Sequence, residues 1–219
     1  MMADAPLDLR AALAADLLRI GAVVLRPEAP FTWASGLRAP IYCDNRTTLA
    51  FPDVRRHIRD GFAALAAHHG LRPDLIAGTA TAGIPHAAWL ADALELPMCY
   101  VRAKPKEHGR GNQIEGRVLP GQRVLLVEDL VSTGGSALAA ALALRDAGAD
   151  VVACLAIFTY GFARAERAFH DANVPLHALT DYDALVGAAS LSPETQATLR
   201  AWREDPDAWS AEWGVRNAE

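Results

Sequence analysis

The sequence predicts an α/β fold, in which a parallel sheet is flanked by helices. Apolar runs of strand length alternate with helical patterns over most of the middle of the chain. The runs at residues 124–127 and 151–158 contain no charged side chain, which is typical of strands buried on both faces. With 219 residues, the chain is long enough to bury one large hydrophobic core.

Each predicted helix has apolar residues at helical spacing, and each predicted strand is a short apolar run bounded by turn residues. The predicted helices cover residues 8–20, 51–69, 84–94 and 135–147. The predicted strands cover residues 22–25, 75–78, 98–102, 124–127 and 151–158. Residues 26–46 are rich in Pro, Gly and aromatic residues and are predicted to be irregular. The region of Trp202 and Trp209 predicts a pair of terminal helices that pack on the body.

The composition excludes several classes of protein. A hydrophobic content of 52% is too high for a disordered chain, and no apolar run reaches the length of a membrane span. The first ten residues are acidic and do not resemble a signal peptide, so we expect a cytoplasmic protein. The net charge of −5 argues against a general nucleic-acid binder.

The cysteines give no sign of a metal site or of disulfides. Cys43, Cys99 and Cys154 are far apart and form no C-x-x-C pair. We expect all three to be small apolar residues in or near the core.

The most informative segment is VLLVEDLVSTGGS, at residues 124–136. It predicts a buried strand, then the acids Glu128 and Asp129, then a Gly/Ser/Thr loop that opens a helix. A helix N-terminus offers unpaired N–H groups and a positive dipole end to a phosphate. Carboxylates repel phosphate but accept hydrogen bonds from sugar hydroxyls, so the segment favours a sugar phosphate. The alternative is an ordinary helix start with two acids lost in the core, which is costly.

A second segment is a basic, glycine-flanked loop. Arg102, Lys104, Lys106 and Arg110 cluster in an otherwise acidic chain, next to Gly109 and Gly111. A mobile cationic loop suits a polyanionic substrate. Taken alone, the loop is better interpreted as a solvated, charged surface segment; beside the 124–136 segment, the substrate loop is favoured.

Together with two further segments, these motifs resemble the orotate phosphoribosyltransferases, a family of type I phosphoribosyltransferases. Residues 124–136 resemble the family's phosphoribosyl-pyrophosphate (PRPP) signature, and residues 100–116 resemble its mobile catalytic loop. Residues 31–46 resemble a segment of the small N-terminal lobe of the family, called the hood, and residues 78–85 resemble the family's pyrophosphate loop. The four motifs follow one another in order from Phe31 to Ser136, over about half of the chain.

The resemblance implies a single phosphoribosyltransferase domain over residues 1–219. Within it we expect a hood mainly from residues 1–50, an α/β core at about 51–185 and C-terminal helices at 186–219. It also implies a cytoplasmic homodimer with shared active sites that joins PRPP to orotate in pyrimidine biosynthesis, with Mg2+ as cofactor. Small-molecule substrates are then the partners, with no nucleic acid and no membrane.

The resemblance also implies roles for individual residues, which are assigned one motif at a time. Those implied to bind PRPP are Arg102, Lys106, His108, Glu128, Asp129, Leu130, Val131, Ser132, Thr133, Gly134, Gly135 and Ser136. Among them, Lys106, Asp129 and Glu128 are implied to be catalytic, and Thr81, Ala82 and Gly83 form the pyrophosphate loop. The orotate candidates are Ser132, Tyr42 and Arg46. No residue is expected to bind the metal directly, because Mg2+ should be carried by the substrate.

The chain departs from some family members at several positions. Lysines of those members are replaced by Ala34, Ala82 and Ala103. Some members bind the orotate carboxylate with an arginine just after the strand at 151–158, where this chain reads Thr-Tyr-Gly. Arg46 and the backbone near Ser35 and Gly36 are the candidates to replace it. Tyr42 is a candidate to stack on the pyrimidine ring.

Two other functions are alternatives to this one. A purine phosphoribosyltransferase would share the fold, but the hood segment at residues 31–46 argues against it. A non-catalytic regulator that senses PRPP and binds nucleic acid should carry a basic face or an appended DNA-binding unit, and the sequence shows neither.

Overall fold

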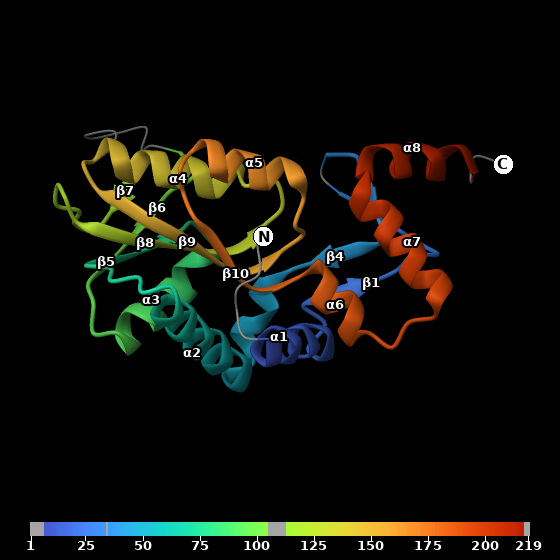
Figure 1. Cartoon of the computed structure of the whole chain (residues 1–219), viewed down its shortest axis with the longest axis horizontal. Helices are drawn as coiled ribbons and strands as arrows, with labels where there is room; N and C mark the ends of the chain where they lie inside the picture. Colours follow the sequence, from blue (N-terminus) through green and yellow to red (C-terminus); the bar gives the residue numbers. More distant parts are fainter. Residues whose placement is uncertain (1–6, 34, 105–112, 217–219) are drawn as a thin grey trace.

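The protein is described here by a computed structural model, which covers residues 7–33, 35–104 and 113–216. Its centre is a six-stranded sheet with the strand order β10-β9-β8-β5-β6-β7 (Figure 1). All neighbouring strands run parallel except β6 and β7, which are antiparallel. The strands are β5 (Leu75–Thr79), β6 (Met98–Val101), β7 (Ile114–Glu115), β8 (Arg123–Val131), β9 (Asp150–Thr159) and β10 (Leu176–Asp181).

Helices cover both faces of the sheet, as the continuous apolar strands predict. One face carries α1 (Leu7–Arg19), α2 (Pro52–His68) and α3 (Gly83–Ala93), and the other carries α4 (Gly135–Asp146) and α5 (Ala163–Asp171) (Figure 1). Alternate side chains of β8 pack on opposite faces of the sheet. Leu125 and Val127 belong to one hydrophobic cluster, whereas Val124 and Leu126 belong to the other. The α/β fold class is therefore confirmed.

A second lobe, which we call the hood, lies beside the sheet (Figure 1). Its strands pair antiparallel as β1 with β4 and β2 with β3. The strands are β1 (Val23–Leu25), β2 (Phe31–Thr32), β3 (Arg38–Ala39) and β4 (Ile41–Cys43), followed by the 3-10 helix η1 (Asn45–Ala50). The same lobe contains α6 (Tyr182–Ala188), α7 (Pro193–Glu204) and α8 (Pro206–Arg216).

The hood is built from both ends of the chain, because its C-terminal helices bind its N-terminal strands. Trp202 of α7 is fully buried, and its Nε1 donates to the carbonyl of Arg38 at 3.3 Å. The backbone N of Arg38 in turn donates to Ser210 Oγ at 2.9 Å. Trp202 also packs edge-on against the rings of Trp33 and Tyr160. The predicted terminal helix pair is thus present, with Trp202 at its centre.

Most predicted elements are present, with ends that shift by a residue or two. The main difference is β8, which continues past Val127 to Val131, so both acids lie within the strand and not after it. The elements η1, β7, α5, β10 and α6 were not predicted, and residues 26–46, predicted to be irregular, contain the short strands β2, β3 and β4. The helix α5 is short and consists mainly of charged residues and alanines, and β10 is an edge strand, so neither contains a long apolar run.

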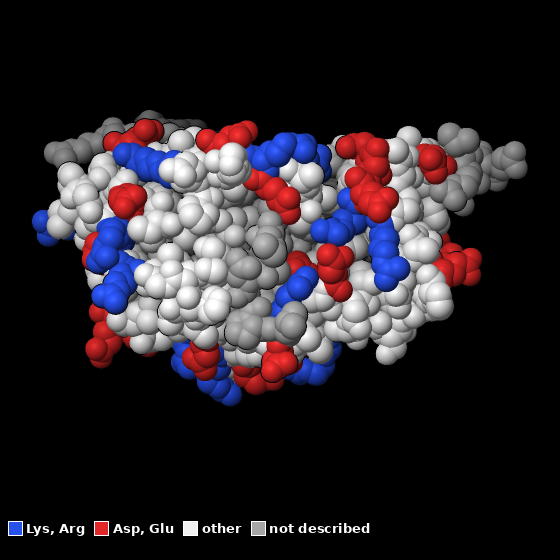
Figure 2. All heavy atoms as spheres, in the orientation of Figure 1, with Lys and Arg blue, Asp and Glu red and all other residues white. Residues whose placement is uncertain are grey.

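Three further features concern the core and the surface. Cys99 and Cys154 are buried and free, as predicted, and Cys43 is half-buried. Acidic and basic side chains are interspersed over the face drawn in Figure 2 and do not gather into one patch of a single sign. Among the helices of the described ranges, none combines the length and apolar character needed to cross a membrane.

Replacing Trp202 with Ala should destabilise the protein strongly. The indole fills a fully buried position against several other rings, so its loss leaves a large cavity. We expect the free energy of unfolding to fall by about 3–5 kcal/mol, measured by urea denaturation. Trp202→Phe should cost less than Trp202→Ala because it keeps a ring in place. A loss below about 1 kcal/mol for Trp202→Ala would show that the hood does not depend on this side chain.

Candidate active site

The acid pair lies at the carboxyl end of β8, where the loops of the parallel sheet converge. Glu128 is only 4% exposed, and both of its carboxylate oxygens are engaged. One accepts from the backbone N of Asp129 at 3.0 Å, and the other accepts from Ser136 Oγ at 3.1 Å. The Asp129 carbonyl accepts from Nδ2 of the buried Asn45 at 2.7 Å, which ties the hood to the sheet at the site.

Burial makes both acids reluctant to ionise. It raises the pKa of Glu128 to about 8, with the Asp129 carboxylate as the next contributor. Burial is also the largest influence on Asp129, whose pKa is raised as well. The pair therefore favours a ligand that brings hydrogen-bond donors or positive charge to it.

The loop after β8 leads directly into the open N-terminus of α4. Gly134 has φ +85°, and a Cβ there would lie 2.7 Å from the ring of Phe169 in α5, so only glycine fits. No side-chain hydrogen bond caps this helix end, so the first N–H groups of α4 can donate to a ligand. Ser136 connects this first turn to Glu128. The structure thus places the predicted phosphate loop and the acid pair side by side.

The predicted pyrophosphate loop follows the neighbouring strand β5. Gly83, the first residue of α3, packs so closely on β8 that a Cβ there would lie 2.5 Å from the carbonyl oxygen of Val127. Ala82 precedes it, and no side chain caps this helix either. Thr81 is exposed. A second open helix end therefore lies against β8 at the residue that precedes Glu128.

The predicted catalytic loop is described only at its ends. Arg102 follows β6, and its backbone N donates to the carbonyl of Gln113 at 2.9 Å. Its guanidinium lies 3.7 Å from the carboxylate of Glu115 in β7. Lys106 and His108 lie outside the described residues, so their predicted roles stay predictions.

An aromatic cavity of about 450 Å3 lies between the hood and the sheet. Tyr42, which is 43% exposed, lines it together with Ser132 at the start of the phosphate loop. The remaining lining residues are Thr32, Trp33, Cys43, Leu130 and Tyr160. The predicted orotate candidates Tyr42 and Ser132 thus face one cavity.

Arg46, the third orotate candidate, is engaged elsewhere. Its guanidinium donates to both carboxylate oxygens of Asp44, at 2.6 and 2.7 Å. This pairing lowers the pKa of the Asp44 carboxyl. The charge of Arg46 is therefore already neutralised by its own neighbour.

A second cavity, of about 560 Å3, adjoins the aromatic one and shares Trp33 and Ser132 with it. Arg164 and Asp207 are the charged residues among its described lining residues. The others are Ser35, Gly36, Leu37, Thr133 and Ser210. Sequence reasoning did not single out Arg164, because α5, the helix that carries it, was not predicted.

This fold and this site define a phosphoribosyltransferase of type I. The family model described as phosphoribosyl transferase domain matches residues 49–187. An orotate phosphoribosyltransferase structure from Aeropyrum pernix superposes with a TM-score of 0.70 at 30% identity, over 80% of this chain and 96% of that one. One from Mycobacterium tuberculosis, in complex with PRPP, gives 0.64 at 26% identity, over 81% and 98%.

The curated relatives narrow the class. The orotate phosphoribosyltransferase of Bacillus caldolyticus is 57% identical over 203 residues, which are 91% of this chain and 98% of the relative. That of Bacillus subtilis is 52% identical over 94% of this chain and 96% of the relative. The chain belongs to the orotate phosphoribosyltransferase family, and the resemblance seen in the sequence is confirmed.

Replacing Glu128 with Gln should flatten the pH dependence of stability. Because the pKa of Glu128 is raised from 4.5 to about 8, the folded protein keeps a proton that the unfolded chain releases. The free energy of unfolding should therefore fall as the pH rises through this window, and Asp129 acts in the same direction. Urea midpoints measured from about pH 5 to about pH 8 should fall less steeply for Glu128→Gln. Parallel curves would contradict the assignment.

Proposed function

We propose that this site transfers the phosphoribosyl group of PRPP to orotate and releases orotidine 5'-monophosphate and diphosphate, in pyrimidine biosynthesis. One observation carries the proposal. A buried acid pair separates two open helix ends on the sheet, and an aromatic cavity lies beside it under the hood. These are the groups that a ribose with a phosphate at each end and a flat pyrimidine require. The reaction fits a cytoplasmic enzyme.

The phosphates of PRPP bind to the two helix ends. The 5'-phosphate accepts hydrogen bonds from the backbone at Ser132–Ser136, where the dipole of α4 favours negative charge. Leu130 and Val131 lead into this loop and orient it. The diphosphate lies against Thr81–Gly83, at the start of α3. The ribose then spans the distance between the two ends, over the acid pair.

The acid pair holds the ribose and stabilises the transition state. Asp129 and Glu128 accept hydrogen bonds from the ribose hydroxyls, which add to the two that Glu128 already accepts within the protein. When the diphosphate leaves, positive charge develops at C1, and these carboxylates stabilise it electrostatically. No covalent nucleophile is needed, because positioning of orotate against C1 replaces it.

Mg2+ is the cofactor that we propose, and the donor set fits it. Carboxylate oxygens are hard ligands, and Glu128 and Asp129 provide them beside the diphosphate loop. Within the described residues, no group of three or more His, Cys, Asp or Glu side chains is arranged to hold a metal ion. The ion would be held mainly by the substrate's own oxygens, with the acid pair nearby, and it would neutralise diphosphate charge.

The catalytic loop is proposed to complete the site from a second subunit. Arg102, Lys106 and His108 bind the diphosphate oxygens and neutralise them as the diphosphate leaves. Closure of the loop excludes water from C1. The functional unit is then a homodimer, in which each loop serves the partner's acid pair.

The base lies in the aromatic cavity. Tyr42 stacks on the pyrimidine ring, and Ser132 donates to it from the start of the phosphate loop. Arg46 stays a weaker candidate for the orotate carboxylate, because Asp44 already pairs with it.

The direct test mixes the protein with orotate, PRPP and Mg2+ and follows the fall in orotate absorbance. Asp129→Asn should keep the fold and lower kcat by roughly 100-fold, because a preorganised charge is lost. Asp60→Asn, a surface carboxylate on α2 paired with Arg59, is the matched control and should keep full activity. Full activity in Asp129→Asn would overturn the role of the acid, and no turnover in the unmodified protein would overturn the function.

Lys106→Ala should lower kcat by roughly 10²–10³-fold, and not merely raise KM, because the lysine acts on charge that grows in the transition state. Ala34, Ala82 and Ala103 leave it fewer lysine neighbours than some relatives have. Mixing inactive Lys106→Ala with inactive Asp129→Asn subunits should restore activity, since one site of each hybrid would be intact. If verified subunit exchange restores nothing, each loop serves its own subunit.

A further inference from the structure

We propose that Arg164 binds the carboxylate of orotate and so selects this pyrimidine over an uncharged one. The inference rests on the proposed function and names the residue that recognises its second substrate. Orotate is an anion, and a carboxylate that leaves water needs a charge-assisted partner. Among the described residues that line the two cavities, Arg164 carries the only positive charge.

The position of Arg164 is fixed by contacts on both sides of it. Before it, Arg203 of α7 donates to the carbonyl of Tyr160 at 3.1 Å, and Thr159 Oγ1 donates to the carbonyl of Val131 at 3.2 Å. After it, Phe169 packs on Gly134. The first turn of α5 is therefore held beside the end of β8 and the start of the phosphate loop.

The guanidinium of Arg164 is oriented but not neutralised. It lies over the ring of Phe162, 5.1 Å from the centroid, and no ion pair joins it to another described residue. Arg46 differs, because its two hydrogen bonds to Asp44 already satisfy its charge. Among the described residues that line the two cavities, Arg164 is thus the cation that is available to a ligand.

The two cavities place the ring and the carboxylate in adjoining spaces. The ring stacks on Tyr42 in the aromatic cavity, and the carboxylate points past Ser132, which both cavities share, toward Arg164. Asp207 on α8 lines the second cavity too and repels an anion. The carboxylate therefore binds on the α5 side of this cavity. The backbone of Ser35 and Gly36, predicted from sequence to meet the carboxylate, lines the same space.

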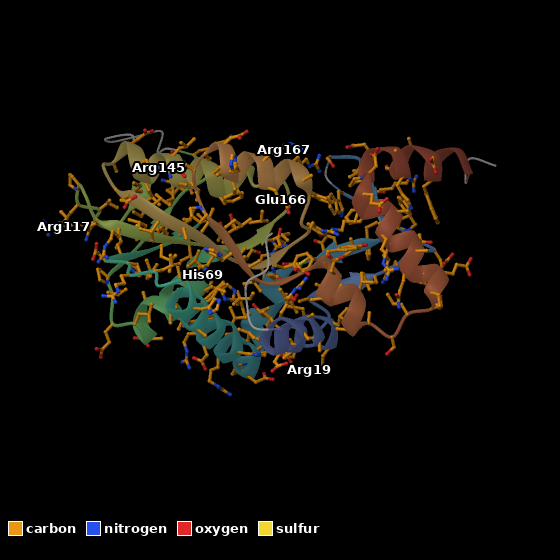
Figure 3. The ribbon with its side chains drawn as sticks, in the orientation of Figure 1. Arg19, His69, Arg117, Arg145, Glu166 and Arg167 are labelled. Atoms are coloured by element: carbon orange, nitrogen blue, oxygen red, sulfur yellow. The ribbon has the colours of Figure 1, made fainter. Side chains whose placement is uncertain are left out.

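The test compares Arg164→Gln with Arg167→Gln in steady-state assays that vary orotate and PRPP separately. Arg167 is an exposed arginine of the same helix, lies beside Glu166 and lines a different cavity (Figure 3). Arg164→Gln should raise the KM for orotate by roughly 10–100-fold and leave the KM for PRPP within about twofold. Arg164→Lys should recover part of the loss, and Arg167→Gln should behave like the unmodified protein.

Competition with uracil, which lacks the carboxylate, separates recognition from a packing defect. Arg164→Gln should lose affinity for orotate and keep the affinity of the unmodified protein for uracil. A rise in the KM for PRPP alone would assign Arg164 to the 5'-phosphate and overturn the proposal, as would an unchanged KM for orotate. Equal losses for orotate and uracil would indicate a packing role and also overturn it. If the unmodified protein does not turn over orotate, it is the proposed function that fails.

Discussion

The register of β8 between β5 and β9 determines where every group of the site lies. Val127 pairs with Gly78 on one side and with Leu155 on the other, so the three strands end at the same edge of the sheet. The loop after β5 then meets β8 through Gly83, where no Cβ fits, and the loop after β8 opens α4. Because parallel strands bring their carboxyl ends together, two helix N-termini and an acid pair meet without any long-range loop.

Burial of the two acids lowers the stability of the folded protein, and the acids have a function only when a ligand is bound. Among the described residues, Glu128 accepts hydrogen bonds from a serine hydroxyl and a backbone N–H, and no cation pairs with it. Its raised pKa expresses this cost. Hydroxyl donors, or a metal ion carried by the substrate, would relieve it. The same burial therefore strengthens the electrostatic interaction of the acid pair with any hydrogen-bond donor or cation that reaches it.

The sheet, the acid pair and the glycine loops could be predicted from the sequence because each depends on a local pattern of residues. Buried parallel strands read as continuous apolar runs, and Gly134 and Gly83 occupy positions that only glycine tolerates. Arg164 was not predicted, since its helix α5 is only nine residues long and consists mainly of charged residues and alanines. Nor could the sequence show that Asp44 neutralises Arg46, or that Trp202 meets Arg38, because such contacts depend on tertiary packing.

The sharing of the hood between both ends of the chain sets the order in which the site is completed during synthesis. The hydrogen bond from Trp202 to Arg38 spans 164 residues, and Arg203, one residue further, fixes the turn that precedes Arg164. A growing chain can pair β5, β8 and β9 and form the phosphate loop well before these residues leave the ribosome. The aromatic cavity is completed only when α7 docks, because Trp33 and Tyr160, which line it, pack on Trp202. A chain stalled before α7 would thus hold the sheet and the loop after β8 without a finished aromatic cavity.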